Sequence, residues 1–209
     1  MSIRLPNGAR IADSFTVEPG TTVRGLSKAS LDQESLSPFT IPLTSFRVWD
    51  AIATNLPATP ATDDLGLLGN TFATGSPTIE TGDLKAAGAT TRYARVLIPM
   101  PMEYDAASDV VLRIHAGMKT TVSDTTATID VQAYRSDEEA GIGSDLCNTA
   151  ATTINSLTLS DKDFTITAGS LSAGDLLDVR IAIAINDGAS GTAVIGQIGS
   201  VKLLCDTRG

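Results

Sequence analysis

Residues 177–186 read LDVRIAIAIN, and this stretch decides the fold class. Every second residue from Leu177 to Ile185 is a branched aliphatic one, and the residues between them are polar or small. Because successive side chains of a β-strand point to opposite faces, this period of two predicts a strand with one face in a core. The run Asn186-Asp187-Gly188 then predicts a turn, since these residue types tolerate positive φ.

The same alternation recurs on both sides of this strand. It predicts strands over 92–102, 109–118, 126–134, 163–167 and 193–205, with shorter ones within 43–49 and 65–72. Strands that follow strands, with Gly, Asp and Ser in the turns, indicate an all-β sandwich. Several connections are too long for a meander, which favours a jelly-roll (Greek-key) β-sandwich. No repeat of fixed period is present, which argues against a solenoid or a propeller.

The first part of the chain has a different composition from the rest. Residues 1–38 are rich in Pro, Gly, Ser and Thr, and we expect them to form an extended N-terminal arm before a sandwich over 39–209. Phe15, Val17 and Phe39 are the expected interface anchors of this arm, because apolar side chains in a polar segment need a surface on which to be buried. Simple disorder of the arm is the alternative.

Composition and charge limit the partners. The chain has 209 residues and a formal net charge of −9, which repels phosphate backbones, so no nucleic-acid partner is expected. No run of about 18 apolar residues is present, so no membrane partner is expected. The N-terminal residues lack the features of a signal peptide, and we expect assembly in a cytoplasm. The two cysteines, Cys147 and Cys205, are expected to be free thiols, although a single disulfide stays open.

The search for catalytic chemistry identifies little. The one histidine, His115, is expected to be a surface or interface residue beside Arg113. The densest acidic groups, at 63–64, 137–139 and 161–163, are expected in turns, where carboxylates are usually solvated; bound calcium is a minor alternative. No phosphate-binding loop or nucleophile elbow is present. We therefore expect no catalytic residues, no metal and no cofactor.

Three stretches resemble small structural proteins of tailed bacteriophages. They are 53–66, 120–131 and 174–181, and the resemblance covers residues 41–209. It implies a jelly-roll virion protein, most of all a capsid decoration (cement) protein that forms homotrimers on the outside of the shell. It also implies the major capsid protein and further copies of this chain as partners, and the capsid surface of the virion as the location.

Two alternatives stay open, because a fold does not fix a function. A carbohydrate-binding or adhesion module, as on a tail fibre, would line a groove with an exposed aromatic residue such as Trp49 or Tyr134. An enzyme would bring His115 and carboxylates together in a cavity.

Overall fold

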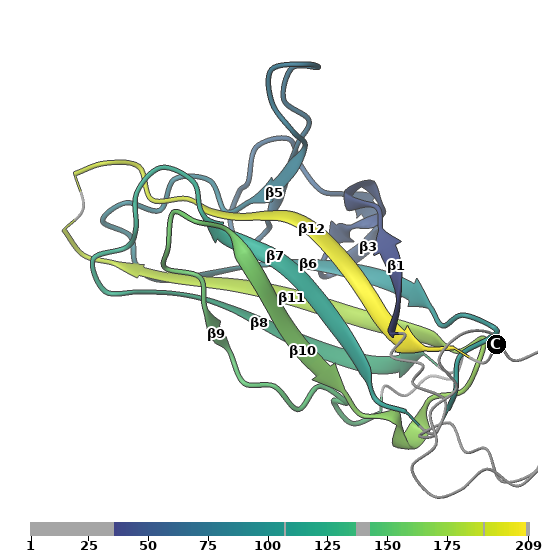
Figure 1. Ribbon diagram of the computed structural model, residues 1–209. Coiled ribbons are helices and arrows are strands. Elements are labelled where there is room, and N and C mark those ends of the chain that lie inside the picture. Colours follow the sequence, from purple (N-terminus) through teal and green to yellow (C-terminus); the bar gives the residue numbers. More distant parts are fainter. Residues whose placement is uncertain (1–35, 107, 137–142, 190, 208–209) are drawn as a thin grey trace, which may run out of the picture. The chain divides into compact units, whose positions relative to one another are not determined.

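The chain folds as a sandwich of two antiparallel sheets (Figure 1). This computed structural model describes residues 36–106, 108–136, 143–189 and 191–207. Their strands are β1 (Leu36–Ile41), β2 (Arg47–Val48), β3 (Ala51–Asn55), β4 (Gly66–Leu68), β5 (Thr78–Glu80), β6 (Gly88–Pro99), β7 (Val110–Met118), β8 (Thr126–Ser136), β9 (Thr152–Thr153), β10 (Ser160–Ile166), β11 (Leu176–Asp187) and β12 (Gly196–Asp206). Two 3-10 turns, Leu43–Ser45 and Ala168–Ser170, complete the regular elements.

Each sheet contains six strands. The first sheet has the order β10-β7-β12-β5-β4, and β1 pairs with β12 beside this path. The second sheet has the order β3-β2-β6-β11-β8-β9. In Figure 1, β7, β10 and β12 cross in front of β6, β8 and β11. The long strands alternate between the sheets along the chain, as in a jelly roll, so the predicted all-β sandwich is confirmed.

Strand β11 lies at the centre of the second sheet. It pairs along almost its whole length with β6 on one side and with β8 on the other. Its alternate residues from Leu177 to Ile185 are at most 1% exposed, as the period of two predicted. The first sheet covers this face with buried residues of β7 and β12, such as Leu112 and Val201.

The two sheets approach closely where β12 begins. A Cβ atom at Gly196 would lie 2.9 Å from Cγ2 of Ile183 on β11, which is too close for any side chain. Glycine is therefore needed at this position because of a close approach between layers, and not because of its backbone angles.

The expected boundary between arm and sandwich, at residue 38, falls inside β1. This strand begins at Leu36 and pairs with β12, from Leu36 opposite Asp206 to Ile41 opposite Val201. Phe39 is thus a strand residue that packs, half-buried, against the core of its own sandwich. Its role as an anchor to another subunit stays a prediction, and Phe15 and Val17 lie outside the described residues.

Both cysteines are free thiols, with Cys205 buried on β12 and Cys147 half-buried. Burial raises the pKa of each thiol. Over the described ranges, no helix is long and apolar enough to cross a membrane.

Replacement of Ile181 by Asp tests the core. Ile181 is 0% exposed and lies between Ala94 and Val131, so a carboxylate there would have no partner. We expect the variant to lose more than about 4 kcal/mol of unfolding free energy or to be unfolded. Ala184→Asp, on the opposite face of the same strand, is the control, and urea unfolding followed by circular dichroism is the measurement. An Ile181→Asp variant as stable as this control would contradict the assignment of the core.

Candidate functional site

The outer face of the second sheet carries a group of aromatic and polar side chains, which we call the aromatic cluster: Trp49, Asp63, Tyr93, Gln132 and Arg180. Trp49 is half-buried in the two-residue turn between β2 and β3, where Val48 pairs with Ala51. Its indole Nε1 donates a hydrogen bond to Oδ2 of Asp63 over 3.0 Å. The indole is therefore fixed both by a tight turn and by a carboxylate.

Backbone hydrogen bonds hold Asp63 beside Tyr93. The Tyr93 N–H donates to the carbonyl of Asp63 over 2.7 Å, and the Leu65 N–H donates to the carbonyl of Tyr93 over 2.8 Å. The segment around Asp63 thus runs along β6, which places the rings of Trp49 and Tyr93 with centroids 5.1 Å apart and planes inclined by 47°. Tilted pairs at this separation are favourable for aromatic quadrupoles.

Arg180 of β11 connects the rings to the next strand. Its guanidinium carbon lies 4.9 Å from the ring centroid of Tyr93 and 5.5 Å from that of Trp49, within cation–π range. The same guanidinium donates a hydrogen bond to Oε1 of Gln132, directly opposite on β8. The cluster therefore forms a row across β6, β11 and β8 that begins at the β2–β3 turn.

A charged pair adjoins this row. Arg95 of β6 donates two hydrogen bonds to the carboxylate of Asp178 on β11, one of them 2.7 Å from Nε to Oδ1. The hydrogen bonds that Arg95 donates to Asp178 raise the pKa of Arg95, and the charge attraction between the two groups adds to this rise. Asp178 is only 7% exposed, so this two-point contact fixes both side chains beside Arg180.

The acidic end of the cluster has a perturbed carboxyl group. Burial, with the nearby charges of Asp63 and Asp50, raises the pKa of Asp64, and the charge of Arg92 opposes this. Oδ1 of Asp64 and Nε of Arg92 are buried atoms without a hydrogen-bond partner, and burial lowers the pKa of Arg92. The acidic pair at 63–64, expected in a turn, thus brings Asp63 to the aromatic cluster and leaves Asp64 half-buried near Arg92.

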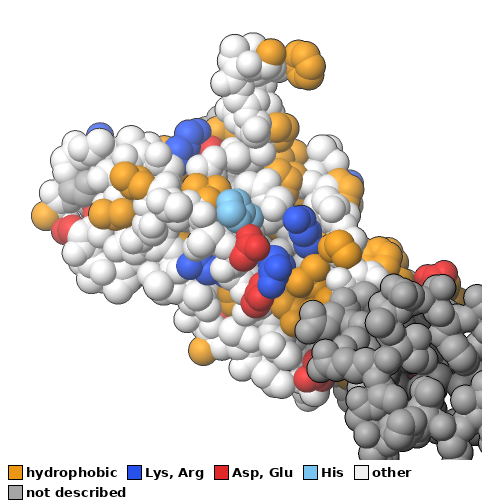
Figure 2. Space-filling view, in the orientation of Figure 1, with side chains coloured by type: hydrophobic (Ala, Val, Ile, Leu, Met, Phe, Trp, Pro, Cys, Tyr) orange, Lys and Arg blue, Asp and Glu red, His pale blue; other side chains and the backbone are white. Residues whose placement is uncertain are grey.

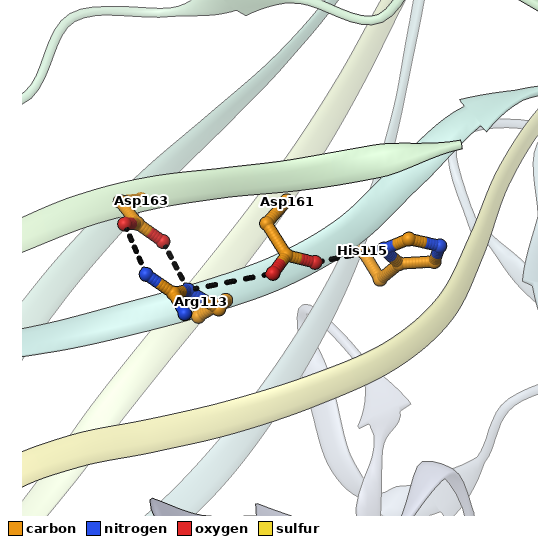
Figure 3. Close-up of polar contacts among 4 residues, drawn as sticks. All are labelled: Arg113, His115, Asp161 and Asp163. Atoms are coloured by element: carbon orange, nitrogen blue, oxygen red, sulfur yellow. Dashed lines mark hydrogen bonds and ion pairs between the residues drawn. The ribbon is translucent and has the colours of Figure 1, made fainter. Parts of the chain in front are cut away.

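The first sheet carries a second candidate on its outer face, the charged quartet of Arg113, His115, Asp161 and Asp163 (Figure 3). Nδ1 of His115 lies 2.7 Å from Oδ1 of Asp161. Arg113 donates two hydrogen bonds of 2.7 Å each to Asp163, and its Nε lies 3.7 Å from Oδ2 of Asp161. The register of β7 and β10 produces this order, because His115 lies opposite Asp161 and Arg113 opposite Asp163.

The quartet is a solvated surface network. Its four side chains are between 37% and 51% exposed, and Figure 2 shows the histidine and its charged neighbours on the open face of the molecule. The enzyme alternative requires His115 and carboxylates to meet in a cavity. Here they meet on the exposed surface instead. Across the described part of the chain, no group of three or more His, Cys, Asp and Glu residues could hold a metal ion.

The expectation that 161–163 form a turn is wrong, because these residues lie on β10. Three successive charged residues have the composition of a turn, but here Asp161 and Asp163 occupy the outward positions before the buried Phe164. Tyr134, the other aromatic residue proposed for a groove, is half-buried on β8 opposite Asp178.

Comparisons with known proteins give only remote structural likenesses. No family model and no curated protein matches the chain. The CBM22-1 xylan-binding domain of Paenibacillus barcinonensis Xyn10C is 11% identical over 70% of this chain and 83% of that one, with a TM-score of 0.39. The xylan-binding module CBM15 is 13% identical over 84% and 100%, with a TM-score of 0.40. A family 30 carbohydrate-binding module of Clostridium thermocellum is 10% identical over 71% and 86%, with a TM-score of 0.38.

At these identities and scores, the likenesses do not bear on function, which has to rest on the chain's own side chains.

Acid should weaken the fold through the charged quartet. The hydrogen bonds from Arg113 lower the pKa of the Asp163 carboxylate in the folded chain. As the pH falls below about 4, this carboxylate is therefore protonated in the unfolded chain before it is protonated in the folded one. The stabilisation is complete above the pKa of the unfolded state and is lost as the pH falls through the lower folded value. We expect Asp163→Asn and Arg113→Gln each to reduce the dependence of unfolding free energy on pH in this range, measured by urea unfolding. An unchanged dependence in both variants would contradict the assignment.

Proposed function

We propose that the domain is a non-catalytic module that binds a carbohydrate chain across the outer face of the second sheet. The observation that carries this proposal is the arrangement of the aromatic cluster. A half-exposed indole is fixed beside a second ring, and a guanidinium and an amide continue the same row over β11 and β8.

The chemistry of the row suits a sugar. Pyranose rings have C–H faces that pack on aromatic rings, and their hydroxyl groups both donate and accept hydrogen bonds. The cluster offers two rings, a guanidinium donor on Arg180, an amide on Gln132 and a carboxylate on Asp63. Ligand sites typically combine an apolar surface with a few placed polar groups in this way.

The site is organised before any ligand arrives. The turn at Trp49, the Asp63–Tyr93 backbone contacts and the Arg95–Asp178 pair hold the side chains through strand register. Side chains that are already ordered lose little entropy on binding. With strands about 4.8 Å apart, the row from β2 to β8 spans about 14 Å, enough for a short oligosaccharide.

Binding to soluble polysaccharides tests this proposal. The probes are arabinoxylan, mixed-linkage β-glucan and the acidic polymer polygalacturonate, and the measurements are affinity gel electrophoresis and isothermal titration calorimetry. We expect the domain to bind at least one polymer and Trp49→Ala to weaken binding about 30-fold or more, because the substitution removes the larger of the two aromatic contacts.

Lys202→Ala is the matched control, since Lys202 is exposed on β12 of the first sheet. It should bind as the wild type does. Wild-type protein that binds no polymer, or a Trp49→Ala variant that keeps full affinity with its fold intact, would overturn the proposal.

A second candidate is the shell protein that the sequence resemblance implies, a trimeric decoration protein bound to the major capsid protein on the virion surface. The observation that favours it is a set of large apolar side chains that lie exposed, each of which a neighbouring subunit could cover: Leu36, Ile52, Phe72, Leu97, Met102, Val122 and Leu157. Burial of such groups against a neighbour is favourable.

The mass of the full chain in solution tests this second candidate. A trimer should have three times the monomer mass of 21.6 kDa in size-exclusion chromatography with light scattering. Removal of residues 1–34, which leaves β1 intact, should then reduce the trimer fraction. A monomer at every protein concentration would count against a self-assembling shell protein.

A further inference from the structure

The loop between β4 and β5 projects from the body of the sandwich, with hydrophobic side chains at its tip (Figures 1 and 2). Phe72 in this loop is 96% exposed, the highest value among the exposed large apolar residues of the described chain. A phenylalanine that stays in water forgoes the stabilisation that burial would give. Its exposure therefore needs a reason other than the stability of the sandwich.

Internal hydrogen bonds brace the loop. The Asn70 side chain donates to the carbonyl of Ser76 and so joins the two ends. The Thr74 N–H and hydroxyl donate to the carbonyl of Thr71 over 3.0 and 2.9 Å. Ala73, next to Phe72, has a φ of 68°, a left-handed conformation that is rare for alanine. These contacts hold the loop backbone in a shape that leaves the phenyl ring in solvent.

The same loop curves around a space that is widely open to solvent and is lined only by the loop's own residues, 69, 70 and 72–77. The lining residues include Phe72 and the polar residues Asn70, Thr74 and Ser76. From Leu65 to Ile79 the sequence contains no charged residue. The loop therefore offers a ligand an aromatic ring and hydrogen-bonding groups but no charged partner.

We propose that this loop is a second saccharide-contact site, in which the Phe72 ring stacks on one face of a neutral pyranose and the surrounding amide and hydroxyl groups bind its hydroxyls. This inference rests on the proposed carbohydrate-binding function. A protein partner is less well matched, because a stable protein contact buries a contiguous apolar core. Here the exposed phenyl ring has only Ala73 and Pro77 as apolar neighbours in the loop, and the other lining residues are Asn, Thr, Ser and Gly. A membrane surface is also a poor match, since basic residues are missing from the loop.

The test compares substitutions at Phe72 in the full chain. Arabinoxylan and mixed-linkage β-glucan are the neutral probes, with polygalacturonate as the acidic comparison, in the same two binding assays. Phe72→Ala and Phe72→Leu should each lower affinity for a neutral polymer about 3- to 10-fold, and Phe72→Trp should retain it, because only a ring face can stack. All three variants should keep the thermal unfolding midpoint of the wild type, since the loop lies outside the core.

The outcomes separate this inference from the proposed function. If no polymer binds the wild type, both are overturned. If Trp49→Ala loses binding while Phe72→Ala and Phe72→Leu keep it, only the loop site is overturned. If Phe72→Ala loses binding while Trp49→Ala keeps it, the loop site stands and the aromatic cluster is overturned as the site. If sedimentation velocity shows that the wild type self-associates and that Phe72→Ala dissociates with unchanged polymer affinity, the loop is a contact between copies.

Discussion

The arrangement of the molecule depends on the pairing of β11 with β6 and β8 along almost its full length. Its inner face is aliphatic, and burial of that face fixes the pairing register of β11 to one alignment. A shift by one residue would move every side chain to the opposite face of the sheet. Asp178 and Arg180 must therefore lie on the outer face, opposite partners that β6 and β8 supply. The candidate binding surface is thus a consequence of how the core is filled.

The long strands were predictable from the sequence, because a period of two is a local property. Of the short strands, β2 and β4 lie within the predicted segments 43–49 and 65–72, whereas β3, β5 and β9 have two to five residues each, too few for a period to be recognised. Their pairing depends on neighbours that lie far away in the chain, such as β12 for β5. The three charged residues at 161–163 led to the prediction of a turn, although the outward positions of an edge strand can have the same composition.

The sites were less predictable than the fold. Trp49 was identified as a candidate because it is the single tryptophan. Its contacts with Asp63, Tyr93 and Arg180 could not be predicted, because they depend on the β2–β3 turn, on the pairing of the Asp63 segment with β6 and on the register of β6 with β11. Phe72 was placed at the end of an expected strand over 65–72. Its exposure follows from the left-handed Ala73 and from the Asn70–Ser76 contact, which no local composition signals.

Strand β10 ends the strand order of the first sheet, where another polypeptide could add to the ladder. Its residues Asp161, Lys162 and Asp163 oppose such growth. If two copies met there in antiparallel fashion about Lys162, each Asp161 would face an Asp163 and the two lysines would face each other. Like charges in directly opposed positions repel, so the sequence of this edge strand disfavours antiparallel pairing with a second copy in that register.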